Sequence, residues 1–339
     1  MPPAASVANA NARIKRMPVL GSFWWALGIG WVALGIAGWQ YAGVKHIPAW
    51  VAVPVAAAFL IEYAFYLAAG MPAMRQRLSR WSRPRLATAL TASGLAPYLL
   101  YSTLTGEFRL AACGAVLAIA AGVSFWYIRL RPVWWTDLTF LVLLAAAVLS
   151  GVLRALYTSP VPRLPLEILG HLMLIHVAVL AVLLLRGMED AGLGFIPSAR
   201  EVWTGLRYSA LFCVVGLPLA FALQVVHLPA HPPPAWRVAA LLLGVFWVVA
   251  YSEEFFFRGL LQTWLSQWCH SGTAGLLVAS TCFGLVHLNY GRQFPNWRVA
   301  LCAAIAGLFY GRALQSSRSV RASMVAHAIV VTVWKSLAA

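Results

Sequence analysis

The chain has 339 residues, of which 62% are hydrophobic and only 10% are charged. Soluble globular domains carry about 25% charged residues, so this composition excludes a soluble globular protein. The formal net charge is +16, but the charged residues sit in short segments between apolar runs. We therefore interpret the basic excess as a signal of membrane topology and a contact for the lipid bilayer, and we expect no nucleic-acid partner.

Apolar runs recur along the whole chain, each of about 20 residues and long enough to cross a bilayer as a helix. Unpaired backbone groups are too costly in lipid, and the runs lack period-two alternation, so they are predicted to be helices. The expected fold is all-α, a polytopic transmembrane helix bundle of about eleven spans, within a range of 9–13. The spans are predicted at residues 18–43, 49–70, 87–105, 108–128, 137–157, 167–185, 207–228, 238–264, 273–290, 298–315 and 321–338.

Two parts are expected along the chain: an N-terminal transmembrane helical module, residues 1–206, to which no role is assigned, and a C-terminal core, residues 207–339, which carries the motifs described below. Most Lys and Arg residues fall in cytoplasmic loops if the N-terminus is cytoplasmic, so the positive-inside rule predicts that orientation. The composition is rich in Ala, Arg and Trp and poor in Lys, which suggests a bacterial inner (plasma) membrane.

Carboxylates inside apolar spans are expensive and are therefore candidates for function. Of nine acidic residues, Glu62 falls within the second predicted span, and the adjacent pair Glu253 and Glu254 falls within the eighth. Helical spacing places Arg258 one turn after Glu254, so the two can form an ion pair. Glu253 then points about 100° away, which leaves it free for chemistry.

Two histidines lie in neighbouring spans, His287 in the ninth and His327 in the eleventh. If the eighth and ninth helices form a hairpin that turns near residues 269–272, Glu253 and His287 lie at similar depth. We therefore expect Glu253, His287 and His327 to meet. His171 and His176 are interpreted instead as hydrogen-bonded packing residues.

Three ordered motifs carry a family resemblance. They are Glu-Glu-x-x-x-Arg at 253–258, Phe-x-x-x-His at 283–287, and His327 after Gly-Leu-Phe-Tyr-Gly at 307–311. Over about residues 236–339 the chain resembles the CAAX-processing and bacteriocin-processing (CPBP, or Abi) intramembrane proteases. The third motif of this family commonly continues His-x-x-x-Asn, whereas Val331 stands at the matching position. An amide that would stabilise an oxyanion is therefore missing or supplied from elsewhere.

Peptide hydrolysis needs an activated water, a polarised carbonyl and a proton for the leaving amine. We expect a desolvated Glu253 to act as general base on a water that His287 positions, and His327 to donate to the oxyanion. The resemblance implies the same roles for these three positions, with Glu254 and Arg258 orienting and balancing the site. Glu253, His287 and His327 are also a plausible zinc ligand set. The sequence has no His-Glu-x-x-His motif, which favours the metal-free, glutamate-centred mechanism and no cofactor.

Two alternatives stay open: a catalytically inactive family member that acts as a membrane scaffold, which Val331 favours, and a transporter that uses buried acids, which Glu62 favours. For an active enzyme the expected substrate is a membrane-anchored protein or peptide. Three further polar residues near the motifs receive no role: Tyr251, Asn289 and Ser323.

Overall fold

The computed structural model describes residues 19–162, 164–188, 191–229, 231–291 and 294–337. Within these residues every regular element is a helix, and nine helices are long and apolar enough to cross a membrane. The predicted polytopic helical bundle is confirmed, and the number of spans lies within the predicted range. The protein is an integral membrane protein.

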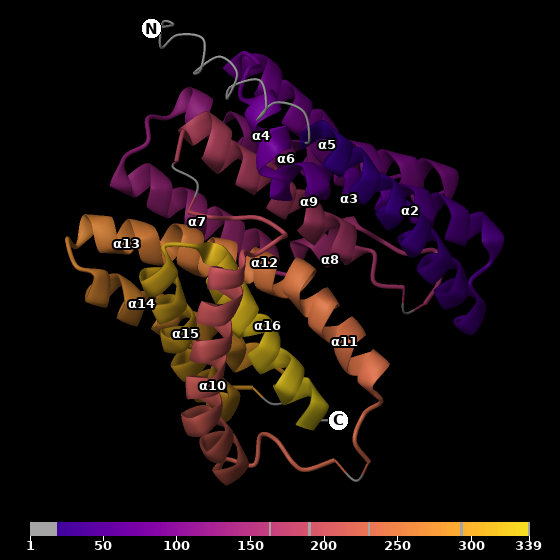
Figure 1. Ribbon diagram of the computed structural model, residues 1–339. Coiled ribbons are helices and arrows are strands. Elements are labelled where there is room, and N and C mark those ends of the chain that lie inside the picture. The colour runs from indigo at the N-terminus through magenta and orange to yellow at the C-terminus, as the bar shows by residue number, and fades with distance from the viewer. Residues whose placement is uncertain (1–18, 163, 189–190, 230, 292–293, 338–339) are drawn as a thin grey trace, which may run out of the picture. The chain divides into compact units, whose positions relative to one another are not determined.

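The chain divides into two compact units, residues 1–189 and 190–339. The first contains α2, α3, α5, α6 and α9, which are joined by shorter helices, and α3 packs against α2, α5 and α9 (Figure 1). The bounds are α2 (Val19–Val44), α3 (Ala49–Gly70), α4 (Pro72–Leu78), α5 (Arg83–Leu104), α6 (Leu110–Arg129), α7 (Trp134–Leu149), α8 (Val152–Leu156), α9 (Glu167–Leu180) and the π-helical η1 (Ala181–Arg186).

Two predicted spans of this unit are helices that do not qualify as spans by themselves. The predicted span 87–105 corresponds to α5, which is long enough but carries Ser, Thr and Pro among its apolar residues. The predicted span 137–157 corresponds to α7, which has only 16 residues before the chain turns at Gly151. The remaining nine predicted spans coincide with the nine candidate spans of the structure.

A buried polar chain links three helices of the first unit. Oε1 of Glu62 lies 2.6 Å from Nδ1 of His176, and Nε2 of the same ring lies 3.0 Å from Oγ of Ser93. Glu62 and His176 are fully buried. The expectation that His176 is a hydrogen-bonded packing residue agrees with this geometry, because its partners satisfy both ring nitrogens.

The second unit holds the three motifs. Its last helix, α16, packs against α10, α15 and the start of the long helix that begins with α11 (Figure 1). The bounds are α10 (Ala199–Ala222), α11 (Ala235–Gly244), η2 (Val245–Ala250), α12 (Tyr251–Glu254), η3 (Phe255–Gln262), α13 (Thr263–Trp268), α14 (Gly272–Val286), the 3-10 turn η4 (His287–Asn289), α15 (Trp297–Ser317) and α16 (Val320–Leu337).

Helix α10 begins at Ala199, eight residues before the predicted start of that span at 207. Ser198 and Glu201 form a capping box: the Ser198 backbone amide donates to Oε2 of Glu201 at 2.6 Å, and the Glu201 amide donates to Oγ of Ser198 at 3.4 Å. Oε1 of Glu201 also accepts from Arg321 on α16 at 2.9 Å. The first turns of α10 therefore pack within the second unit, whereas the sequence analysis placed residues up to 206 in the first part.

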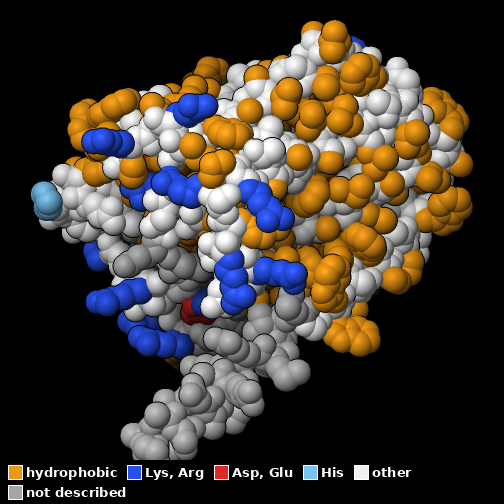
Figure 2. All heavy atoms as spheres, turned by 90° about the horizontal axis from the view of Figure 1, so that it is seen from above, with side chains coloured by type: hydrophobic (Ala, Val, Ile, Leu, Met, Phe, Trp, Pro, Cys, Tyr) orange, Lys and Arg blue, Asp and Glu red, His pale blue; other side chains and the backbone are white. Residues whose placement is uncertain are grey.

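Apolar side chains face outward over much of the molecule. On α2, Trp24, Trp25 and Trp39 are 62%, 74% and 67% exposed. Figure 2 shows one face, on which hydrophobic side chains cover wide areas and Lys and Arg side chains gather in a few places. Exposed apolar area of this extent is what a lipid-facing surface requires.

Candidate active site

One continuous helical stretch, residues 235–268, carries the first motif. Its middle contains two π-helical segments, η2 and η3, which flank the single turn that holds Glu253 and Glu254. Oγ1 of Thr263 bonds to the carbonyl of Arg258, five residues earlier, at 2.8 Å. π-Helical insertions are rare and recur at functional sites, because they rotate side chains relative to a regular helix.

Glu254 is the buried centre of the site. Its Oε1 accepts from Nη1 of Arg258 at 3.1 Å, as the i,i+4 spacing predicts, and lies 2.7 Å from Nδ1 of His327. The side chains of Glu254 and Arg258 are fully buried, and that of His327 is 2% exposed. A buried carboxylate needs such partners, since an unpaired charge in this environment is strongly unfavourable.

Glu253 lies at the edge of a cavity, with its Oε2 buried and without a hydrogen-bond partner among the described residues. Its side chain is 34% exposed, and its Oε2 lies 3.8 Å from Nε2 of His327. That separation is too long for a direct hydrogen bond. The two adjacent glutamates therefore have different surroundings: Glu254 is buried and paired, and Glu253 is accessible.

His287 ends α14, where its Nδ1 lies 2.7 Å from the carbonyl oxygen of Phe283. A carbonyl oxygen only accepts, so Nδ1 must carry the proton in this contact. In the neutral ring Nε2 is then unprotonated, and it is free to accept a hydrogen bond from a water or a substrate.

Glu253, His287 and His327 line one cavity of about 140 Å³. The rest of its wall is mostly apolar and includes Phe212, Phe283, Ala306, Val330 and Val331. The structure thus brings three of the five predicted site residues to a common cavity and places Glu254 and Arg258 behind it. Val331, which replaces the expected amide, faces this cavity as well.

An aromatic frame holds the His327 ring and the Arg258 guanidinium. Tyr310 stacks on His327 with ring centroids 4.8 Å apart and an interplanar angle of 10°. The Arg258 guanidinium carbon lies 4.4 Å from the centroid of the Phe283 ring and 5.2 Å from that of Tyr310. These cation–π contacts favour the buried cation, so both Arg258 and His327 have fixed orientations.

Two glycines of α15 allow this helix to approach the first motif closely. The carbonyl of Gly307 accepts from Nη2 of Arg258 at 3.1 Å, and the carbonyl of Gly311 accepts from Nε2 of Gln262 at 3.2 Å. A methyl group at Gly311 would lie 2.3 Å from Leu276 and 2.5 Å from Oε1 of Gln262. Gln262 was not singled out by the sequence analysis, although it lies one turn after Arg258 and Gly311 closes the quoted Gly-Leu-Phe-Tyr-Gly segment.

The three polar residues without an assigned role lie outside the cavity wall. Ser323 donates to the carbonyl of Tyr310 at 2.7 Å, which ties α16 to α15. Tyr251 is buried, with its ring centroid 4.8 Å from that of Phe195. Asn289 belongs to the 3-10 turn that follows His287. We therefore assign structural positions, and no chemistry, to these residues.

A zinc ion requires several donor side chains that point to one position. Across the described ranges, no group of three or more His, Cys, Asp or Glu side chains is placed to hold a metal ion. Nδ1 of His327 contacts Glu254 and Nδ1 of His287 contacts the Phe283 carbonyl, which leaves Nε2 of each ring available, as in a histidine that binds a metal. Glu253, His287 and His327 share a cavity, although the described side chains are not grouped as a metal site.

Fold and site together define an integral membrane protein whose C-terminal helices enclose a cluster of glutamate, histidine and arginine beside an apolar cavity. Residues 233–333 match the type II CAAX prenyl endopeptidase Rce1-like family. This match confirms the resemblance predicted from the three motifs, and it covers the C-terminal third of the chain. Comparison with curated proteins and with solved structures gave no match.

Proposed function

We propose that the C-terminal unit is an intramembrane endopeptidase that hydrolyses a peptide bond with a water activated by Glu253. One observation carries the proposal: Glu253 faces a cavity together with His287 and His327, and His327 is fixed from behind by Glu254 and Arg258. The match of residues 233–333 to an endopeptidase family supports the same reaction class.

The proposed mechanism needs a proton on both ring nitrogens of His327. Glu254 contacts both Arg258 and His327, and Glu253 lies near His327 on its other side. If His327 is protonated, the cluster is neutral overall, which a low-dielectric interior favours. Its Nδ1–H then donates to Glu254, and its Nε2–H points toward Glu253 and the cavity.

Hydrolysis follows from this arrangement. Glu253 takes a proton from a water that also donates to Nε2 of His287, and the water oxygen attacks the substrate carbonyl carbon. The negative charge moves from Glu253 to the carbonyl oxygen, where Nε2–H of His327 stabilises it. Collapse of the intermediate breaks the C–N bond, and Glu253 returns its proton to the leaving amine. The net charge of the cluster and substrate stays constant, which avoids creating a new charge inside the membrane.

The substrate that fits is a membrane-anchored protein or peptide, because the cavity lies among transmembrane helices and its wall is mostly apolar. We place the enzyme in a bacterial inner membrane because its composition is rich in Ala, Arg and Trp and poor in Lys. The distribution of Lys and Arg between the loops favours a cytoplasmic N-terminus. Reporter fusions at Lys45 and at Arg80 test this orientation, since the two positions follow successive spans. Lys45 should report the outer side of the membrane and Arg80 the cytoplasm.

The experiment that tests the function is cleavage of tagged, membrane-anchored candidate substrates co-expressed with the wild type, Glu253→Gln or His287→Ala. Glu107→Gln, which changes a loop carboxylate of the first unit, is the matched control. Cleavage by the wild type and the control, lost in both site variants and insensitive to chelator, is the expected result.

Other outcomes separate the alternatives. Loss of cleavage on chelation would assign Glu253, His287 and His327 to a metal site. No cleavage by the folded wild type over a broad substrate set would favour an inactive scaffold or a transporter. Each variant is checked for its unfolding temperature in detergent, so that a lost fold is not read as lost chemistry.

A further inference from the structure

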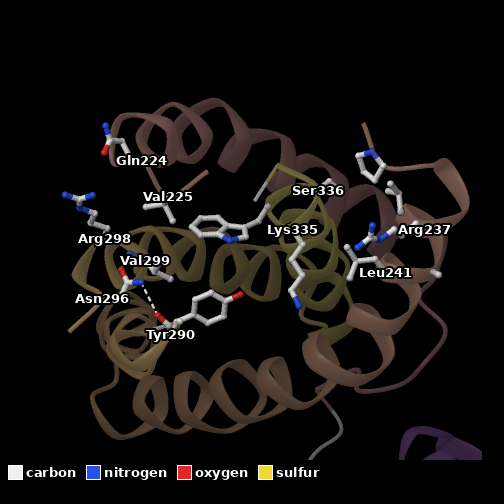
Figure 3. A pocket seen from close by; sticks show the side chains of 15 residues that line it. Gln224, Val225, Arg237, Leu241, Tyr290, Asn296, Arg298, Val299, Lys335 and Ser336 are labelled. Atoms are coloured by element: carbon white, nitrogen blue, oxygen red, sulfur yellow. Dashed lines mark hydrogen bonds between the residues drawn. The ribbon is translucent and has the colours of Figure 1, made fainter. Parts of the chain in front are cut away.

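A second, larger cavity of about 790 Å³ adjoins the catalytic cavity at one end of the C-terminal unit. Four residues line both cavities, Tyr290, Val299, Trp334 and Lys335, so the larger space lies directly beside the site. It is formed where the end of α10, the start of α11, the start of α15 and the end of α16 come together (Figure 3).

The larger cavity is cationic. Its wall contains Arg237, Arg298 and Lys335 and, among the residues that the structure describes, no acidic residue. Arg298 donates to the carbonyl of Leu223 at 3.3 Å and lies at the edge of the view in Figure 3. Arg237 and Lys335 are exposed, and neither has an ion-pair or hydrogen-bond partner in the part of the chain that the structure describes. Unpaired cations beside an acid-free wall favour an anionic ligand.

Lys335 and Tyr290 mark where that anion would bind. In Figure 3 the Lys335 ammonium and the Tyr290 hydroxyl point toward each other, and both residues line both cavities. Lys335 follows His327 by two turns and Val331 by one on α16, so the three share a helix face. Eight residues of helix place Lys335 about 12 Å along the axis from His327. An extended peptide covers about 3.3 Å per residue, so that distance corresponds to only a few residues of substrate.

We propose that Lys335 and Tyr290 bind a carboxylate of the peptide substrate, a few residues from the bond that is cleaved, and that Arg237 and Arg298 supply the surrounding positive field. The inference rests on the proposed peptidase function and adds the chemistry that selects the substrate. The carboxylate is either the C-terminal one or that of an Asp or Glu side chain; an ammonium and a phenolic hydroxyl recognise both.

Binding is measured separately from cleavage, on the purified full chain carrying Glu253→Gln in detergent. The probes are fluorescent, N-acylated hydrophobic tetrapeptides in three forms: a free C-terminal acid, the C-terminal amide, and the amide with one internal Asp, with its Asn counterpart as reference. Each is titrated with and without Lys335→Gln or Tyr290→Phe. Lys45→Gln, which removes a lysine of the first unit, is the matched control.

The expected result is binding of one carboxylate form at least about tenfold tighter than its neutral counterpart, in line with a charge-assisted hydrogen bond. Lys335→Gln should abolish this preference, Tyr290→Phe should weaken it, and Lys45→Gln should leave it unchanged. Preference for the free acid identifies the terminal carboxylate, and preference for the internal Asp identifies a side chain.

Equal binding of all forms overturns the proposal. A preference for the carboxylate that survives Lys335→Gln also overturns it. So does binding to vesicles of phosphatidylglycerol that Lys335→Gln weakens in the absence of peptide, because these cations would then be lipid contacts. A carboxylate preference in a protein that cleaves nothing would refute the peptidase and leave the binding site standing. Cleavage without a preference for the carboxylate would support the peptidase and refute the carboxylate site.

Discussion

Nδ1 of His327 lies 2.7 Å from Oε1 of Glu254, although 73 residues separate them. This contact fixes the imidazole plane, so that the other ring nitrogen faces Glu253 and the cavity. A buried carboxylate that orients a histidine is a recurring way to set its tautomer and direction. In the proposed mechanism Glu254 is therefore a positioning residue, and Glu253 is the group that meets the water.

Glu253→Gln should lower the cleavage rate by about 10²- to 10⁴-fold, the range of general acid–base contributions. The substitution keeps the shape of a side chain that is 34% exposed, so the unfolding temperature should stay within about 2 °C of the wild type. The measurement is initial cleavage rate beside thermal unfolding in detergent. Retention of more than about a tenth of the rate would remove Glu253 from the role of general base.

Arg258→Gln should destabilise the C-terminal unit by about 3–5 kcal/mol, because it leaves the buried Glu254 without its charged partner. Arg312→Gln is the matched control: Arg312 is exposed on α15, and its substitution should cost less than about 0.5 kcal/mol. Denaturant unfolding of both variants gives the comparison. Equal stability of the two would show that the Glu254–Arg258 pair contributes no net stability.

The candidate site residues could be predicted from the sequence, but most contacts between them could not. Glu253, Glu254 and Arg258 in one apolar span, with His287 and His327 in later spans, are visible because charged residues are rare at that depth. The i,i+4 pair of Glu254 and Arg258 follows from helical spacing, and the structure has it.

The contact between His327 and Glu254 could not be derived in this way, because it depends on how α16 packs against the long helix of residues 235–268. The π-helical segments around Glu253 have no reliable sequence signal. The start of α10 did have one: Ser198-x-x-Glu201 is a capping-box pattern, and hydropathy alone placed the helix start too late. Gln262 was missed because an uncharged amide does not stand out among apolar residues.

Gly311→Ala should destabilise the C-terminal unit by about 1–3 kcal/mol, since the added methyl overlaps Leu276 and Gln262. Gly244→Ala is its control, because nothing lies within 4 Å of a methyl at that position. Alanine is the better helix former, so the control should be neutral or stabilising by up to about 1 kcal/mol. Both are compared by denaturant unfolding; equal effects would contradict the close approach of α15 to the first motif.

Glu62→Gln should weaken the first unit by about 1 kcal/mol, because the amide is a weaker hydrogen-bond partner for His176 than the carboxyl group. Cleavage should be unaffected, since Glu62 belongs to a separate compact unit. Thermal unfolding and cleavage rate are measured on the same preparation. A folded variant that has lost cleavage would show that the Glu62–His176–Ser93 chain takes part in the reaction.

Val331→Asn should raise the turnover number by at least about tenfold. Val331 lies one turn after His327 and lines the same cavity, where an amide would add a second donor for the oxyanion. Loss of one such donor typically costs about 10²- to 10³-fold in rate, so gaining one in imperfect geometry should recover part of that factor. Val331→Leu is the control, because it keeps the position apolar and should not accelerate cleavage. Turnover number and KM are determined separately, since an oxyanion donor acts on the former. If Val331→Asn is no faster than the wild type while the fold is intact, the oxyanion does not form beside this turn of α16.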